Sequence, residues 1–142
     1  MTSADWLLLF IAQVPRAPID PVRLQKGLFL LAQSGRLHPS ERYEFEPYSY
    51  GPMSRAVYRD LRVLERARLV RSMPSDHAWA PVTATTRGQH DATRLRSGPV
   101  TASALGELGR IRRLVDSMTF ADLLEHVYAR HPEYAVRSVF RR

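Results

Sequence analysis

The fold is decided by one stretch of the chain, PMSRAVYRDLRVLERARLVRSMPSDHAWAPVT, which occupies residues 52–83. Its first half has apolar residues at helical spacing and predicts a helix from Pro52 to about Arg68. Two short runs suited to strands, 69–73 and 79–83, flank a Pro-Ser-Asp-His turn and predict a β-hairpin. A helix followed at once by a hairpin forms the second half of a winged helix.

Two helices are expected before this stretch. Ser3 is suited to cap a short helix over residues 4–13, and Asp20 followed by Pro21 marks the start of a second helix that ends near Ser34. The apolar band of this second helix is wide, which predicts burial on more than one side and a place as the central core helix. Its apolar residues and those of the helix after Pro52 should form one cluster, which consists of Leu24, Leu28, Leu31, Val57, Leu61 and Leu64.

A long connection, residues 35–51, separates these two helices. Residues 43–46 alternate between aromatic and acidic side chains and predict a short strand, which Pro47 ends. The corner that follows leads to Gly51, the expected N-cap of the next helix. A helix-turn-helix joins its helices by about three or four residues, so it stays open whether the helix after Pro52 can enter a major groove.

More helices are expected after the hairpin, over residues 86–95, 103–118 and 120–131, the last capped by Thr119. The final two carry apolar residues over more of their circumference than one packing surface needs. They either close the domain core or join two chains into a homodimer.

These elements predict a mainly α fold with a small β-hairpin, arranged as one winged-helix-like domain over residues 1–142. Within it, residues of about 20–84 would form the motif-bearing core and residues of about 100–142 a C-terminal helical extension. The length of 142 residues and the hydrophobic fraction of 44% suit a single globular domain.

The charge balance favours an acidic partner. The chain has 21 Lys and Arg residues against 14 Asp and Glu, a net charge of +7, and every basic residue except Lys26 is an arginine. There is no cysteine, which excludes disulfide frameworks, thiolate zinc sites and cysteine nucleophiles and favours a reducing compartment.

The sequence lacks the signals of several other protein classes. The apolar run at residues 6–12 follows Asp5 instead of a basic segment and is too short to span a membrane, so we expect a soluble, cytoplasmic protein with no membrane partner. Nucleophile-elbow, phosphate-loop and paired-histidine metal motifs do not occur. We therefore expect no catalysis, no metal and no cofactor.

One face of the helix after Pro52 carries a row of arginines. At about 100° per residue, four of them fall in a single acid-free stripe opposite the apolar face: Arg55, Arg59, Arg62 and Arg66. The hairpin region adds three more candidates for phosphate contact, Arg71, His77 and Arg87. Such a row beside a wing is suited to phosphates and guanine edges, whereas the alternative is a solvated face in an Arg-rich protein.

Aromatic residues gather just before this helix, at Tyr43, Phe45, Tyr48 and Tyr50. They could stack on unpaired bases, fill a pocket of a partner, or pack against the core helix. Trp79 at the end of the hairpin is expected in the core.

Three motifs follow one another along the chain: LQKGLFLLAQ at residues 24–33, YSYGP at 48–52 and VY at 57–58. In this order and spacing they resemble the Panacea (SocA-like) antitoxin domain and YwgA-like bacterial winged-helix proteins, over about residues 20–70. The resemblance implies a compact helical fold with winged-helix character and a role as an antitoxin or adaptor that binds a partner protein. The chain departs from this family at Tyr48, where Trp is usual, and at Gly27, where a large apolar residue is usual.

Two functions are therefore expected. The first is a non-enzymatic winged-helix regulator that contacts duplex DNA through its arginine row and wing. The alternative is an antitoxin or adaptor that binds a partner protein such as a toxin, with Tyr48, Tyr50 and Tyr58 as contact residues.

Overall fold

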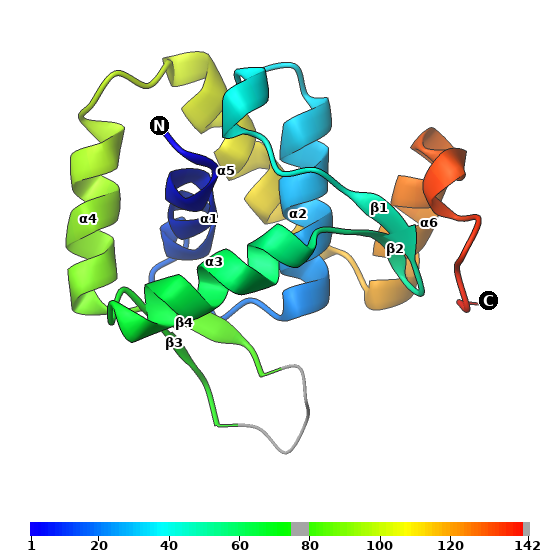
Figure 1. Ribbon diagram of the computed structural model, residues 1–142, viewed down its shortest axis with the longest axis horizontal. Helices are drawn as coiled ribbons and strands as arrows, with labels where there is room; N and C mark the ends of the chain where they lie inside the picture. The colour runs from blue at the N-terminus through cyan, green and yellow to red at the C-terminus, as the bar shows by residue number, and fades with distance from the viewer. Residues whose placement is uncertain (75–79, 141–142) are drawn as a thin grey trace.

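The structure is a computed structural model that describes residues 1–74 and 80–140 (Figure 1). Its elements, of which η1 and η2 are short 3-10 helices, are α1 (Ser3–Ala12), α2 (Pro21–Gln33), η1 (Pro39–Glu41), β1 (Glu46–Tyr48), β2 (Gly51–Met53), α3 (Arg55–Arg66), β3 (Val70–Ser72), β4 (Val82–Ala84), α4 (Thr86–Arg96), α5 (Ala102–Ser117), α6 (Phe120–Arg130) and η2 (Pro132–Tyr134). The expected mainly α fold with a small hairpin is confirmed. None of the helices in these two ranges has the length and apolar character that a membrane crossing requires.

The winged-helix order is built from α1, an extended residue at Ile19, α2, α3 and the β3–β4 wing. The two wing strands pair antiparallel, with Val70 opposite Ala84. Ile19 then adds to the outer side of β4, because its N–H and C=O both bond with Val82 at 2.9 Å. The wing is thereby fixed to the segment between α1 and α2, and in Figure 1 its strands point downward below α3.

The core is centred on α1 as much as on α2. Every residue of α1 from Trp6 to Ala12 is buried, and Figure 1 shows this helix between α4 and α2. The expected burial of α2 on more than one side is confirmed, and α1 shares the centre of the core with it. Gly27 of α2 explains the close approach, because a Cβ there would lie 2.2 Å from Cζ of Phe10. The ring of Phe10 occupies the space that a large residue at position 27 would need.

The start of α3 also differs from the expectation. Pro52 does not open the helix, since Gly51–Met53 forms strand β2 and pairs with β1, placing Glu46 opposite Met53. The N-cap is Ser54, whose backbone N–H and C=O both bond to the side chain of buried Gln25 at 2.9 Å. The turn of this β1–β2 hairpin needs a positive φ at Gly51, which is +87°.

For the other helices, the capping residues in the sequence predict the first helical residue more accurately than they do for α3. Asp20 and Thr119 are the N-caps of α2 and α6, as expected. In α1 the cap is Thr2 instead of Ser3, because Thr2 and Asp5 exchange side-chain to backbone hydrogen bonds in a capping box. The strand expected at 43–46 is shifted to 46–48, because that segment has β2 beside it as a partner.

The last two helices pack onto the winged-helix core within the same chain. Their innermost apolar residues are fully buried, namely Leu108, Ile111, Val115, Leu123, Leu124 and Val127. The helix α5 lies against α2, and α6 lies against both α2 and β2. The C-terminal helices therefore complete the core of a single domain.

Candidate nucleic-acid interface

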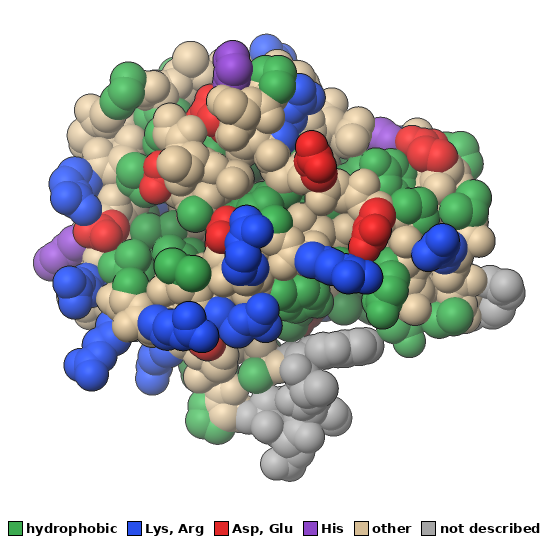
Figure 2. Space-filling view, viewed as in Figure 1, with side chains coloured by type: hydrophobic (Ala, Val, Ile, Leu, Met, Phe, Trp, Pro, Cys, Tyr) green, Lys and Arg blue, Asp and Glu red, His purple; other side chains and the backbone are tan. Residues whose placement is uncertain are grey.

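The helix α3 buries its apolar face and exposes its arginine face, as the spacing of the arginines predicts. Val57, Leu61 and Leu64 are buried against the core. The four residues of the predicted row, Arg55, Arg59, Arg62 and Arg66, are all exposed. Figure 2 shows Lys and Arg side chains gathered along α3 on the side from which the wing projects.

Two arginines in the first half of the row face carboxylates. The side chain of Arg55 is 82% exposed and its Nε lies 3.4 Å from Oε1 of Glu46 on β1. Arg59 pairs with its neighbour Asp60 at 3.4 Å, while Asp60 also accepts a hydrogen bond of 2.8 Å from the hydroxyl of Tyr43. The expectation of an acid-free row is therefore wrong here, because Glu46 reaches the helix from another element. Exposed pairs of this kind are weak and can exchange for a phosphate.

The second half of the row is uncompensated. Within the described ranges, Arg62 and Arg66 have no ion pair. Glu65, which directly precedes Arg66, accepts a hydrogen bond from the hydroxyl of Ser72 on β3. Arg68 follows the C-cap residue Ala67 in the left-handed region, with φ of 61°, and is also exposed.

Positive charge continues from α3 onto the base of the wing. Arg71 on β3 and Arg87 at the start of α4 are exposed, as a phosphate contact requires. His77, the third predicted wing residue, and Trp79, predicted in the core, lie outside the described residues.

A groove beside the wing contains an arginine that the sequence reasoning missed. It has a volume of about 550 Å³ and lies between residues 15–18, the wing strands and the start of α4. Arg16 and Arg71 both line it, together with Thr85 and Thr86. No local pattern marks Arg16, because its position beside Arg71 depends on the pairing of Ile19 with β4.

The aromatic cluster divides into two groups. Tyr43 is buried, and Phe45 packs edge-on against Phe29 with ring centroids 5.4 Å apart, so these two belong to the core. Tyr48 and Tyr50 instead line a second, smaller cavity of about 200 Å³, together with Tyr58 of α3. The three predicted partner-contact residues are thus brought together.

Lys26 and Gln25 of α2 form the inner wall of that cavity, a role the sequence analysis did not assign. Lys26 is 3% exposed, and its Nζ donates to the carbonyl of Pro52 at 3.2 Å. Burial lowers the pKa of Lys26 to about 8, against which the negative charge of Asp20 acts. The available signal was the motif Leu24-Gln25-Lys26, in which two polar residues interrupt a buried helix.

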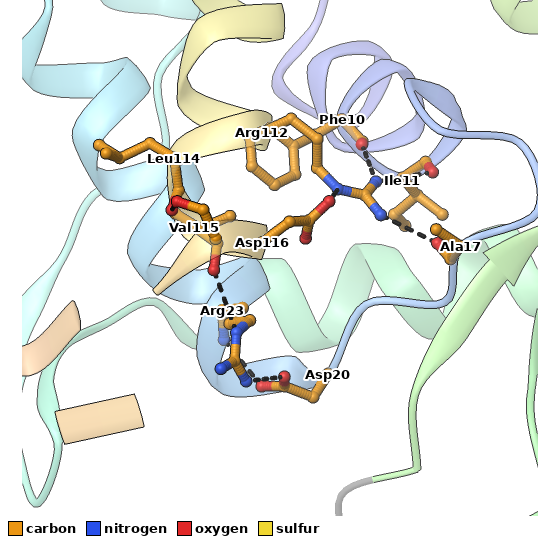
Figure 3. A network of polar contacts seen from close by, with 10 residues as sticks. Phe10, Ile11, Ala17, Asp20, Arg23, Arg112, Leu114, Val115 and Asp116 are labelled. Carbon is orange, nitrogen blue, oxygen red and sulfur yellow. Dashed lines mark hydrogen bonds and ion pairs between the residues drawn. The ribbon is translucent and has the colours of Figure 1, made fainter. Parts of the chain in front are cut away.

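Two further arginines, the fully buried Arg112 and the partly buried Arg23, have their guanidinium groups bonded to backbone carbonyls (Figure 3). Arg112 of α5 donates to the carbonyls of Phe10 at 2.7 Å, Ile11 at 3.0 Å and Ala17 at 2.9 Å. Arg23 of α2 donates to the carbonyl of Val115 at 3.1 Å, at the end of α5. These side chains hold the C-terminal helices to the core, and the buried Arg112 is not accessible to an acidic partner.

Across residues 1–74 and 80–140, no three His, Asp or Glu residues come together as potential metal ligands. Comparison with known protein families finds no model that matches this chain, and comparison with curated proteins finds no match either.

Proposed function

We propose that this protein is a non-enzymatic, cytoplasmic winged-helix regulator that binds duplex DNA through α3 and the base of its wing. The observation that carries the proposal is the exposed arginine surface formed by Arg62, Arg66, Arg71 and Arg87, none of which has an ion pair within the described residues. An uncompensated row of guanidinium groups on a helix beside a wing suits contacts with phosphates and with guanine edges. The lack of cysteine agrees with a reducing compartment.

The position of the long connection supports access to this surface. Its β1–β2 hairpin joins α3 at the N-terminal end and packs toward α6, whereas the wing follows the C-terminal end (Figure 1). Within this connection, Glu46 forms an ion pair with Arg55, the first arginine of the row. We therefore assign the strongest phosphate contacts to the C-terminal half of α3 and to the wing base.

Fluorescence anisotropy with a labelled duplex tests the proposal. Affinity should fall steeply between about 50 and about 200 mM salt, because each bound phosphate releases counterions. A variant with Arg62, Arg66, Arg71 and Arg87 changed to Gln should bind more weakly, and its salt slope should shrink by about one unit per lost contact.

The matched control removes the same charge elsewhere. Changing the exposed Arg36, Arg113, Arg130 and Arg137 to Gln also lowers the net charge by four, but none of these residues lies on α3 or the wing. This control should keep most of the affinity and the salt slope. Equal losses in both variants would show that duplex binding follows net charge alone, and no duplex binding at low salt would contradict the proposal.

The second candidate is an antitoxin or adaptor that binds a partner protein, as the sequence resemblance implies. The observation that favours it is that Tyr48, Tyr50 and Tyr58 line one cavity. Co-expression with the product of the adjacent gene, followed by co-purification, tests this candidate. A complex that survives the four wing and α3 substitutions but is lost on Tyr48→Ala would support it over DNA binding.

A further inference from the structure

The cavity between α2, α3 and the β1–β2 hairpin contains a buried cation. Lys26 is 3% exposed and donates to the carbonyl of Pro52. An ammonium group has three N–H donors, and in the part of the chain that the structure describes no carboxylate lies within ion-pair distance of this one. Asp20, whose charge acts on Lys26, is itself paired with Arg23 at 2.7 Å.

A buried ammonium without an ion-pair partner is costly for the fold. Removing a cation from water costs several kcal/mol unless a nearby anion and hydrogen bonds compensate for the lost hydration. The lowered pKa of Lys26 has the same origin, since desolvation is its main cause. An anion that entered the cavity would therefore meet a charge that the protein has left uncompensated.

The other residues that line the cavity indicate the shape and chemistry of the rest of the anion. Tyr48, Tyr50, Tyr58 and Met53 surround the space with rings and a thioether. The volume of about 200 Å³ is below the usual range of about 300–1,000 Å³ for drug-sized ligands. The cavity thus suits a single flat ring with one charged group.

We infer that this cavity binds an aromatic carboxylate, with the ammonium of Lys26 as its counter-ion and the tyrosine rings around its body. Such a group can be a free small acid or the C-terminal aromatic residue of a peptide. The inference supplies a recognition chemistry for the cavity of the second candidate, and it does not depend on binding of duplex DNA.

Paired ligands that differ only in charge test this inference on the full chain by NMR titration. Benzoate and its neutral analogue benzamide probe the free acid, and Gly-Gly-Phe and its C-terminal amide probe a peptide end. At concentrations up to about 10 mM, a range that suits fragment-sized ligands, each carboxylate that binds should do so at least about tenfold more tightly than its amide. The carboxylate that binds more tightly, benzoate or Gly-Gly-Phe, shows whether the ligand is a free acid or a peptide C-terminus.

The pH profile of the unmodified protein gives a second readout. The groups that face Lys26 are Asp20, the tyrosines at positions 48, 50 and 58, and Tyr128 of α6, whose ring lies against Gly51. Burial raises the pKa of Tyr58 and of Tyr128 and lowers the pKa of Lys26 to about 8, so Lys26 loses its charge between pH 7 and 9.5 before these two tyrosines ionise. Benzoate binding should be strongest near pH 7 and weaken as Lys26 loses its proton.

Two variants locate the site. Lys26→Met removes the charge and should abolish the preference for benzoate over benzamide. Val22 lines the cavity, so Val22→Trp adds bulk to its wall and leaves Lys26 in place. This variant should weaken both ligands, and it tests the site even if the Lys26 variant does not fold. Equal binding of carboxylates and amides by the unmodified protein, or resonance shifts of residues away from the cavity alone, would overturn the inference.

Discussion

Arg112 shows how much one side chain contributes to the assembly of this fold. It is fully buried, caps the last carbonyls of α1 and the loop carbonyl of Ala17, and is paired with Asp116 at 2.9 Å. Helix ends leave carbonyls without intrahelical donors, and a planar guanidinium can satisfy several of them at once. The same residue therefore joins α5 to α1.

We expect Arg112→Met to lower the free energy of unfolding by about 3–5 kcal/mol, because it leaves buried carbonyls unsatisfied. The neighbouring Arg113 is exposed, so Arg113→Met should change stability by less than about 0.5 kcal/mol. Urea denaturation of both variants measures the difference. Similar midpoints for the two variants would contradict the capping role.

Lys26 makes stability depend on pH in a specific direction. Burial lowers the pKa of Lys26 from 10.5 to about 8, so above pH 8 the unfolded chain binds more protons than the folded one. Stability should therefore rise between pH 8 and 10.5, by about 2 kcal/mol at pH 9.5 relative to pH 7. Burial and Asp60 raise the pKa of Tyr43, which acts in the opposite direction only as unfolded tyrosines ionise near pH 10.

Chemical denaturation at pH 7 and pH 9.5 measures this rise. The variant Lys26→Met should show little change between the two pH values, because its position 26 carries no proton to release. A rise of the same size in that variant would assign the effect to another group.

At the scale of elements, the apolar residues of α2 and α3 share one core cluster, as their periodicity predicts, and within it α3 packs mainly against α1 and β3. Leu24, Leu28, Leu31, Val57, Leu61 and Leu64 are all buried in the core, which confirms that prediction. The long connection between the helices adds Leu37 and Tyr43 to this cluster and returns to α3 through β2, which packs against α2.

We expect Leu28→Ala and Leu61→Ala each to cost about 2–5 kcal/mol of stability through lost burial and a residual cavity. Val63 lies on the same helix as Leu61 but is 53% exposed, so Val63→Ala is the control and should cost less than about 0.5 kcal/mol. Thermal and urea unfolding measure all three. Losses below about 1 kcal/mol at both leucines would contradict this description of the core.

At the scale of the whole molecule, self-association through the C-terminal helices stays a prediction. The innermost residues of α5 and α6 are buried in the core of their own chain and are not exposed to a second chain. Leu105, Leu114 and Met118 are only partly buried and would be the apolar residues left to an interface. Light scattering at micromolar concentration tests it: a mass twice 16.2 kDa supports a homodimer, and a mass of 16.2 kDa contradicts one.

The sequence by itself determined the order of the winged helix. Caps such as Asp20 and Thr119, the 3.6-residue periodicity of α3 and the turn residues of the wing act within a few positions of one another, so their signals can be read locally. The exposure of Arg62 and Arg66 followed from the same periodicity.

Only the tertiary structure decided which charges are free, paired or buried. Arg55 gains a carboxylate from β1, Arg112 is withdrawn among the carbonyls of α1, and Lys26 is enclosed behind a hairpin that also moves the start of α3. Each of these outcomes depends on contact between segments far apart in the chain. Electrostatic and desolvation energies depend on distance in space and on burial, which no local pattern of residues records.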